Sequence, residues 1–298
     1  MKTCIIIAGP TAVGKTAIAI DLARFLSTEI ISADSRQCYQ ELNIGVAKPT
    51  LNDLATVQHH FINSHSIEED VSAATFEQFA LHAIAGIFEK HDVAVMVGGT
   101  GLYLQAFAHG LDEIPNVPLD IKKKIADQYA IGGMQWLQHE IEQQDPAYFA
   151  SGELLNPQRM LRALEVKIAS GKSIRDFQSR QKKERPFRII KIGLQLPRDV
   201  LYIRINQRVD EMIAAGLLDE AKQLFMYRNL NALQTVGYRE LFDHFDGTIS
   251  LNRAIELIKQ HTRHYAKRQM TWFKRDPEFR WVELNDGADA VQTILKAV

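Results

Sequence analysis

A glycine-rich segment near the amino terminus has the composition and spacing of a phosphate-binding loop. It reads Gly9-Pro10-Thr11-Ala12-Val13-Gly14-Lys15-Thr16 and satisfies the pattern G-x-x-x-x-G-K-[ST]. Glycines let such a loop wrap a phosphate, while its N–H groups, the start of the next helix and Lys15 supply positive charge. The Thr16 hydroxyl is placed to coordinate Mg²⁺. The segment predicts binding of a nucleotide or another diphosphate, but it does not specify the reaction.

A carboxylate is expected close to this loop. Asp34 follows the short apolar segment 30–33, and Gly98-Gly99-Thr100 follows the apolar segment 93–97, where a nucleotide hydrolase would normally carry an aspartate. The carboxyl ends of parallel strands face one crevice, so Asp34 and Thr100 should both approach the loop. A carboxylate beside a diphosphate can bind metal or act as a base, although aspartate also favours loop and helix-cap positions.

The segment 259–275 is strongly basic and contains no acid. Its cations are Lys259, Arg263, Lys267, Arg268, Lys274 and Arg275, and its interleaved aromatic residues are His264, Tyr265, Trp272 and Phe273. Lys259, Arg263 and Lys267 recur every four residues, which places them on one helix face. Such a face can follow RNA phosphates while aromatic rings stack on unpaired bases. A solvated basic face over a packed aromatic core fits the pattern equally well.

The elements that must position these residues alternate between strands and helices. Short β-branched, apolar segments predict strands at 4–8, 30–33 and 93–97, and apolar residues at helical spacing predict helices at 16–26 and 75–90. Segments 188–194 and 280–282 are predicted as later strands. Continuous apolar strands that alternate with helices predict a parallel sheet covered on both faces. We therefore predict an α/β fold with a P-loop NTPase-like parallel sheet core.

A change of composition marks an insertion in this core. Pro115 and Pro118 open a stretch rich in charge and glutamine, with helical spacing and no β-alternation. We predict a helical insertion domain at 112–186, within a catalytic core formed by 1–111 and 187–298. The pair His59-His60 lacks neighbouring metal ligands and is interpreted as structural or loop histidines.

The amino-acid composition indicates the cellular compartment but leaves the binding partners open. Hydrophobic residues make up 46% and charged residues 24% of the 298 residues, enough for a sizeable core. The formal net charge is -1, so a nucleic-acid surface must come from local clustering. Cys4 and Cys38 are expected to be reduced thiols, and no apolar stretch is long enough to span a bilayer. We expect a soluble, cytoplasmic protein.

Several motifs together resemble one family. They are Gly9–Thr16, Asp34-Ser35, Gly45, Ala47-Lys48-Pro49, Gly98–Tyr103, Gln158–Val166, Val236–Glu240 and Ala266–Phe273. In this order they are similar to bacterial tRNA dimethylallyltransferases, also called tRNA isopentenyltransferases. Asn43 and Val46 stand where that family usually has aspartate and threonine, so a carboxylate or hydroxyl role is not carried over there. Two cysteines exclude the zinc finger that larger eukaryotic relatives add at the carboxyl terminus.

The resemblance implies a reaction and roles for individual residues. Dimethylallyl diphosphate is the implied donor, and the implied acceptor is the exocyclic amino group of the adenine directly 3′ of the tRNA anticodon. The loop Gly9–Thr16, with Mg²⁺ on Thr16, and Arg208 would hold the diphosphate. Asp34 would deprotonate the amino group, and Thr100 would orient the donor near its bridging oxygen. The target base must be flipped out of its stack to react.

The resemblance also implies a set of residues that contact the tRNA anticodon stem-loop. These are Asp34, Ser35, Arg36, Gln37, Thr100, Lys122, Gln158, Arg159, Met160, Leu161, Arg162, Arg263, Lys267 and Arg268. The acting species is expected to be a monomer. Which tRNAs are modified, and whether ATP can occupy the loop, are left open by the sequence.

Two other functions share part of this pattern. A small-molecule kinase of the shikimate- or nucleoside-kinase kind would also have the loop, the acid after the second strand and the Gly-Gly turn. It would leave the basic segment and the later motifs unexplained. A non-catalytic, nucleotide-controlled RNA-binding protein would leave Asp34 and Thr100 without a role.

Overall fold

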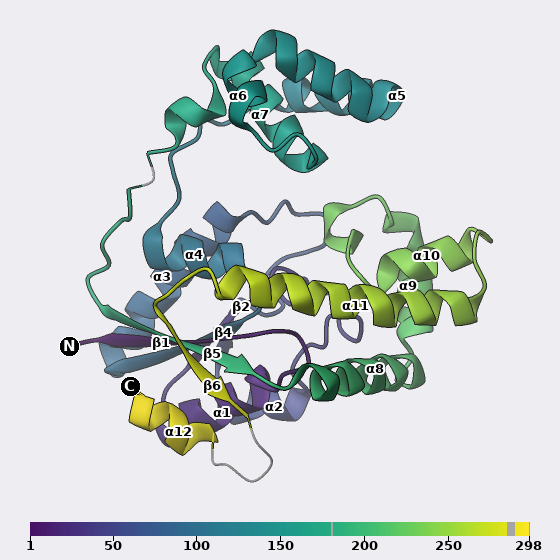
Figure 1. Cartoon of the computed structure of the whole chain (residues 1–298). Helices are drawn as coiled ribbons and strands as arrows, with labels where there is room; N and C mark the ends of the chain where they lie inside the picture. Colours follow the sequence, from purple (N-terminus) through teal and green to yellow (C-terminus); the bar gives the residue numbers. More distant parts are fainter. Residues whose placement is uncertain (180, 285–289, 298) are drawn as a thin grey trace. The chain divides into compact units, whose positions relative to one another are not determined.

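A six-stranded parallel sheet forms the centre of the larger of the chain's two compact units (Figure 1). The computed structural model describes residues 1–179, 181–284 and 290–297. The strand order is β3-β2-β4-β1-β5-β6, and every neighbouring pair is parallel. The strands are β1 Thr3–Ala8, β2 Ile30–Ala33, β3 His59–His60, β4 Val93–Gly98, β5 Arg188–Gln195 and β6 Phe279–Glu283. The predicted strands are confirmed. His59-His60 is an unpredicted two-residue edge strand, and such a short polar pair shows no apolar periodicity.

Successive side chains of each strand point to opposite faces of the sheet and pack into two separate cores. Ile6 and Met96 belong to one core, which includes α3 (Ala73–Lys90) and α4 (Gly101–His109). Ile5, Ile7 and Val95 belong to the other, which includes α1 (Lys15–Phe25) and α8 (Arg198–Ala214). Because both faces of the sheet are covered by helices, the predicted α/β fold is confirmed.

The remaining helices of residues 1–109 and 184–298 surround the sheet. They are α2 Leu51–Thr56, α9 Leu217–Leu224, α10 Tyr238–Phe245, α11 Leu251–Phe273, α12 Ala290–Ala297 and the 3₁₀ turns η2 Phe225–Tyr227 and η3 Asn231–Leu233. The longest of them, α11, is capped by Ser250, whose hydroxyl accepts a hydrogen bond from the Arg253 N–H. No helix within the described ranges is long and apolar enough to cross a membrane.

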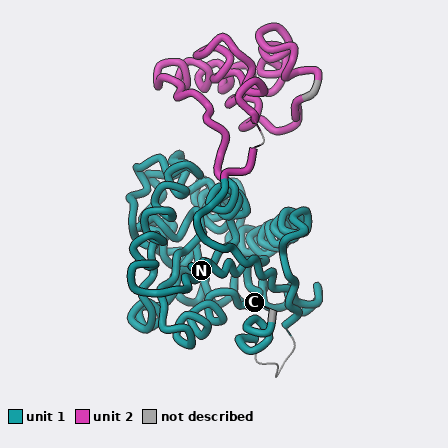
Figure 2. Tube along the Cα trace, turned by 90° about the vertical axis from the view of Figure 1, so that its left-hand side faces the viewer, with its two compact units in different colours: residues 1–109, 184–298 teal, residues 110–183 magenta. Residues whose placement is uncertain are grey.

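The chain divides into two compact units (Figure 2). Unit 1 comprises residues 1–109 and 184–298, and unit 2 comprises residues 110–183. Unit 2 is helical, with α5 Leu119–Gln144, α6 Pro146–Ser151, α7 Pro157–Ser170 and the 3₁₀ turn η1 Ile174–Phe177 around its own apolar core. Asp145 and Asn156 cap α6 and α7, each followed by a proline at the first helical position. The contact-based boundaries lie two or three residues from those predicted for the insertion.

Candidate active site

A cleft of about 830 Å³ lies where β1, β2 and β4 end. Residues that follow each of these strands line it, among them Thr11, Asp34 and Gly99. Close packing at the strand ends requires glycine, because a Cβ on Gly98 would stand 2.1 Å from the Ala33 carbonyl oxygen. The crevice forms where the strand order reverses, the usual ligand position in an open parallel sheet.

The phosphate-binding loop supplies one end of the cleft. Its residues Thr11, Ala12, Gly14, Lys15 and Thr16 line the cleft, whereas Gly9, Pro10 and Val13 are buried behind them. Gly14 adopts φ 105° and caps α1 without a side-chain hydrogen bond, and the first turn of α1 contains no acid. The N–H groups at this helix start therefore form an uncompensated positive end, as an anion site requires.

Two side-chain cations add to this positive end. Lys15 donates a hydrogen bond from Nζ to the Pro10 carbonyl at 2.7 Å. Burial lowers the pKa of Lys15 to about 7; the nearby Arg208 guanidinium lowers it as well, and the Asp34 carboxylate opposes the shift. Burial also lowers the pKa of Arg208, which lines the cleft from α8 and forms no hydrogen bond or ion pair with the described residues. Desolvated cations without an ion-pair partner among the described residues favour a bound anion.

Asp34 lies in the same cleft, in a tight turn after β2. Its Oδ1 accepts hydrogen bonds from the backbone N–H groups of Arg36 (2.9 Å) and Gln37 (3.3 Å). The other carboxylate oxygen accepts none from the part of the chain that the structure describes, so it remains available to a ligand. The turn is also held by Thr100, whose Oγ1 accepts a hydrogen bond from the Ser35 N–H at 3.0 Å. Ser35, Arg36 and Thr100 stand outside the set of described residues that line the cleft.

Gln269, which the sequence does not single out, joins two parts of the site. It lies on α11 with only 7% of its surface exposed. Its Oε1 accepts a hydrogen bond from the Thr11 N–H at 2.8 Å, and its Nε2 donates one to the Gly99 carbonyl at 2.9 Å. The side chain thus fixes the phosphate-binding loop to the turn after β4.

A second unpredicted residue, Glu220 of α9, holds one wall of the cleft. Its carboxylate accepts hydrogen bonds from three consecutive N–H groups, those of Asn43 (3.2 Å), Ile44 (2.9 Å) and Gly45 (3.0 Å). It also accepts one from the Tyr238 hydroxyl at 2.6 Å, and a Cβ on Gly45 would stand 2.6 Å from the Tyr238 ring. One carboxylate therefore holds the first three residues of the segment 43–48.

Inside the same wall, two side chains use their donors on the protein itself. Lys48 donates from Nζ to the Tyr39 carbonyl (2.7 Å), Asn63 Oδ1 (2.6 Å) and Asn43 Oδ1 (3.2 Å). The amide of Gln37 donates to the carbonyls of Val46 (3.2 Å) and Ala47 (3.0 Å). Asn43, which stands where the family usually has aspartate, thus still accepts a hydrogen bond from Lys48. Val46 contributes only its backbone carbonyl. The Gln37 amide, which was predicted to face RNA, supports this wall.

The basic residues of α11 do not all face the same surroundings. Lys259 pairs with Asp210 at 2.6 Å, and Arg263 donates to Asn206 Oδ1 at 2.7 Å, so both contact α8. Lys267 and Arg268, predicted to contact tRNA, are exposed. The helix therefore combines the two arrangements that the sequence leaves open, a packed basic face and an exposed one.

Unit 2 carries the other residues predicted to contact tRNA. On α7, Gln158 and Arg159 are exposed, and Arg159 pairs with Glu153. Leu161, Arg162 and, on α5, Lys122 are half-buried. Met160 is fully buried in the core of unit 2, so its side chain supports α7 and does not present a surface.

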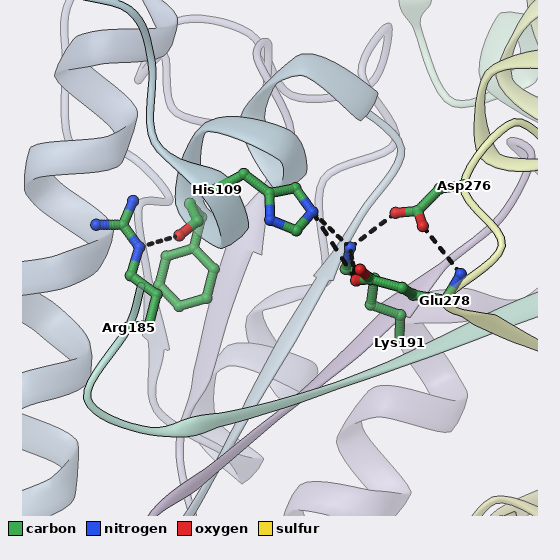
Figure 3. A network of polar contacts seen from close by, with 6 residues as sticks. His109, Arg185, Lys191, Asp276 and Glu278 are labelled. Atoms are coloured by element: carbon green, nitrogen blue, oxygen red, sulfur yellow. Dashed lines mark hydrogen bonds and ion pairs between the residues drawn. The ribbon is translucent and has the colours of Figure 1, made fainter. Parts of the chain in front are cut away.

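A polar network in unit 1 has the residue types of a metal site (Figure 3). His109, Asp276 and Glu278 offer ligand atoms within 4.8 Å of one another. The buried Lys191 ammonium lies among them, 2.9 Å from His109 Nε2 and 2.7 Å from each carboxylate. Beside it, Arg185 donates to the Phe107 carbonyl at 2.7 Å (Figure 3). Because an ammonium already joins the three groups, we interpret this network as structural.

Comparison with known proteins places these features in a family. A family model described as IPP transferase matches residues 37–276. A tRNA dimethylallyltransferase of Christiangramia forsetii is 47% identical over 282 residues, which cover 95% of this chain and 93% of that relative.

Solved structures agree with the sequence comparison. The full-length tRNA isopentenylpyrophosphate transferase of Bacillus halodurans matches with a TM-score of 0.72 and 36% identity, covering 100% of this chain and 94% of that one. A eukaryotic dimethylallyltransferase acting on tRNA matches with a TM-score of 0.82 and 27% identity, covering 99% and 78%. The fold, the phosphate-binding loop and these similarities show together that the chain belongs to the IPP transferase family, the tRNA dimethylallyltransferases.

Proposed function

We propose that this chain transfers a dimethylallyl group from dimethylallyl diphosphate to the exocyclic amino group of the adenine 3′-adjacent to the tRNA anticodon, releasing diphosphate. Family membership supports the reaction class, since the relatives carry the name tRNA dimethylallyltransferase. The observation that carries the proposal is the cleft itself. Two desolvated cations, Lys15 of α1 and Arg208 of α8, line it together with the Asp34 carboxylate.

The positive end of the cleft suits the leaving group. As the allylic C–O bond breaks, its electron pair moves to the bridging oxygen and negative charge builds on the diphosphate. The N–H groups at the start of α1, with Lys15 and Arg208, stabilise this charge in fixed positions. Thr16 lines the cleft in the first turn of α1, and its hydroxyl, together with phosphate and water oxygens, would offer the oxygen ligands that Mg²⁺ prefers. Bound Mg²⁺ would neutralise part of the diphosphate charge.

The carboxylate suits the acceptor. The adenine amino nitrogen forms the new bond to the allylic carbon and must lose a proton, which passes to the free oxygen of Asp34. The contacts of Thr100 support an indirect role in place of the predicted contact with the donor. Because its hydroxyl binds the Ser35 N–H, Thr100 positions the Asp34 turn.

The tRNA anticodon stem-loop is the proposed macromolecular partner, and a tRNA substrate implies a cytoplasmic enzyme. Exposed cations of both units support this, Lys267 and Arg268 on α11 and Arg159 on α7. The predicted contacts at Asp34, Ser35, Arg36, Lys122, Gln158, Leu161 and Arg162 are retained in the proposal, as is a monomeric enzyme. Arg263 and Gln37 act by supporting neighbouring elements.

One assay tests the reaction and the roles together. Unmodified tRNA is incubated with the enzyme, dimethylallyl diphosphate and Mg²⁺, and its nucleosides are analysed by mass. An adenosine heavier by one five-carbon prenyl group is expected, without ATP. Asp34→Ala should lower kcat by about 10²–10⁴-fold with donor affinity nearly unchanged, whereas Lys15→Ala should weaken donor binding as well. Undiminished turnover by Asp34→Ala would remove the base assignment, and an unchanged tRNA would remove the reaction.

A further inference from the structure

Tyr265 differs in kind from the other side chains of the cleft. Among the described residues that line the cleft, it is the only phenylalanine, tyrosine or tryptophan. Aliphatic side chains that suit a prenyl tail are plentiful there, including Ile44, Leu54, Ile62 and Met212. The donor's five-carbon tail therefore does not need an aromatic wall, and the ring remains to be explained.

The placement of Tyr265 joins the cleft to the exposed basic surface. It lies on α11 one turn before Gln269, the residue that binds the phosphate-binding loop. The Arg268 guanidinium lies 5.7 Å from the centre of the Tyr265 ring, a cation–π distance. The residue keeps 37% of its surface exposed, and its hydroxyl forms no hydrogen bond with residues that the structure describes. A partly open ring without a polar partner, beside an exposed arginine, is available to a ligand.

Tyr265 and the proposed base Asp34 line the same cleft. Burial raises the pKa of Tyr265, and the Asp34 carboxylate raises it further, while Arg36 and Arg268 act in the opposite direction. The phenol therefore stays neutral at physiological pH. A neutral aromatic ring adds no negative charge where diphosphate and carboxylate already meet.

We infer that Tyr265, with Arg268 beside it, forms the stacking wall of the acceptor site and holds the extruded adenine against Asp34. This inference rests on the proposed function and names the residue that positions its second substrate. Aromatic rings and arginine planes are the groups on which proteins stack unpaired RNA bases. Such stacking contributes about 1–3 kcal/mol per base, which corresponds to about 5–150-fold in affinity.

Substitutions at Tyr265 separate the ring from the hydroxyl. Tyr265→Phe keeps the ring and should retain kcat/KM for an anticodon stem-loop within about threefold, whereas Tyr265→Ala should lose about 10–100-fold. The Kd of dimethylallyl diphosphate without RNA should stay unchanged in both. Tyr227→Ala is the matched control, because Tyr227 is half-buried on unit 1 and is not among the described residues of the cleft.

A second readout responds to stacking itself. A stem-loop carrying 2-aminopurine at the acceptor position cannot be prenylated, since it lacks the exocyclic amino group at that ring carbon, and its fluorescence is quenched by stacking. Bound to the parent or to Tyr265→Phe, the probe should stay quenched, and bound to Tyr265→Ala it should brighten. If Tyr265 only supported the fold, the probe would be equally quenched when bound to Tyr265→Phe and to Tyr265→Ala.

The outcomes distinguish the inference from the proposed function. If the parent prenylates tRNA while Tyr265→Ala keeps kcat/KM within about twofold, the stacking wall is wrong and the reaction stands. If Tyr265→Ala weakens donor binding instead, the ring belongs to the donor site and the inference is overturned. If Tyr265→Phe loses as much as Tyr265→Ala, the hydroxyl carries the effect and stacking is again overturned. A parent that leaves tRNA unmodified removes the reaction on which the inference rests.

Discussion

Donor binding should weaken as pH rises above neutrality, and Lys15 should be the cause. Burial lowers the pKa of Lys15 to about 7 in the unliganded protein. A bound diphosphate would pair with the ammonium and keep it protonated, so binding above pH 7 requires uptake of a proton. Affinity must then fall with rising pH, because the free protein holds progressively less of the protonated form.

The size of the effect follows from the pKa. With a pKa of about 7, the protonated fraction of Lys15 falls from about one quarter at pH 7.5 to about one hundredth at pH 9. The Kd for dimethylallyl diphosphate should therefore increase by about 24-fold over this range. The range lies above the last ionisation of a phosphate, at about pH 6, so the ligand's own charge stays nearly constant.

Calorimetric titration with the donor alone, at constant Mg²⁺ and ionic strength, measures this dependence. Lys15→Arg is the control, since a guanidinium keeps its charge throughout the range and should flatten the curve even if its affinity is lower. A parent Kd that stays constant within about twofold from pH 7.5 to 9 would refute the reasoning. A slope that persists in Lys15→Arg would assign it to another cation of the cleft, Lys48, whose pKa is also lowered by burial.

Three further substitutions test the contacts that hold the site together. Gln269→Ala leaves a loop N–H and a buried carbonyl without partners, and urea unfolding should show a loss of about 1–3 kcal/mol with weaker donor binding. Glu220→Gln places amide hydrogens against backbone N–H groups, and the donor Kd from calorimetry should rise about tenfold, as loss of one charged hydrogen bond would give. Lys191→Met leaves two carboxylates facing each other, and the free energy of unfolding should fall by about 3 kcal/mol, the lower end for buried pairs, because Glu278 is half-exposed.

Exposed residues of similar type provide controls for these three variants. Gln260→Ala lies on the same helix as Gln269, Asp219→Asn removes an exposed acid next to Glu220, and Lys90→Met removes an exposed lysine. The free energy of unfolding of each control variant should stay within about 0.5 kcal/mol of the value for the parent. A variant that matches its control would show that the corresponding contact does not hold the site.

The sequence predicts the parts of the fold and site that depend on neighbouring residues. Runs such as 4–8 and 93–97 are continuous and β-branched, so their strands are recognisable, and the glycine-rich loop lies between a strand and a helix as its chemistry requires. Asp34 is found for the same reason, since strand ends in a parallel sheet meet at one edge. The edge strand β3 escapes prediction because two histidines carry no periodicity.

The parts that the sequence does not predict depend on distant partners. Gln269 binds Thr11 across 258 positions, and Glu220 binds Ile44 across 176. Periodicity shows that Arg263 shares a face with Lys259, but not that this face meets α8. Tyr265 looks like one aromatic among several until the fold places it in the cleft. Such roles arise from tertiary contacts, which no local pattern records.

The crowding around Gly9, Gly98 and Gly99 has a practical consequence for redesign. A Cβ at Gly9 would stand 2.6 Å from the Leu194 carbonyl oxygen, and one at Gly99 would stand 2.2 Å from Gln269 Nε2. A side chain at Gly9 would therefore displace backbone behind the cleft, and one at Gly99 would displace the Gln269 amide that holds the phosphate-binding loop. Mutant libraries that seek longer isoprenoid donors should leave these glycines unchanged. They should randomise apolar side chains that line the cleft, such as Leu54, Ile62 and Met212.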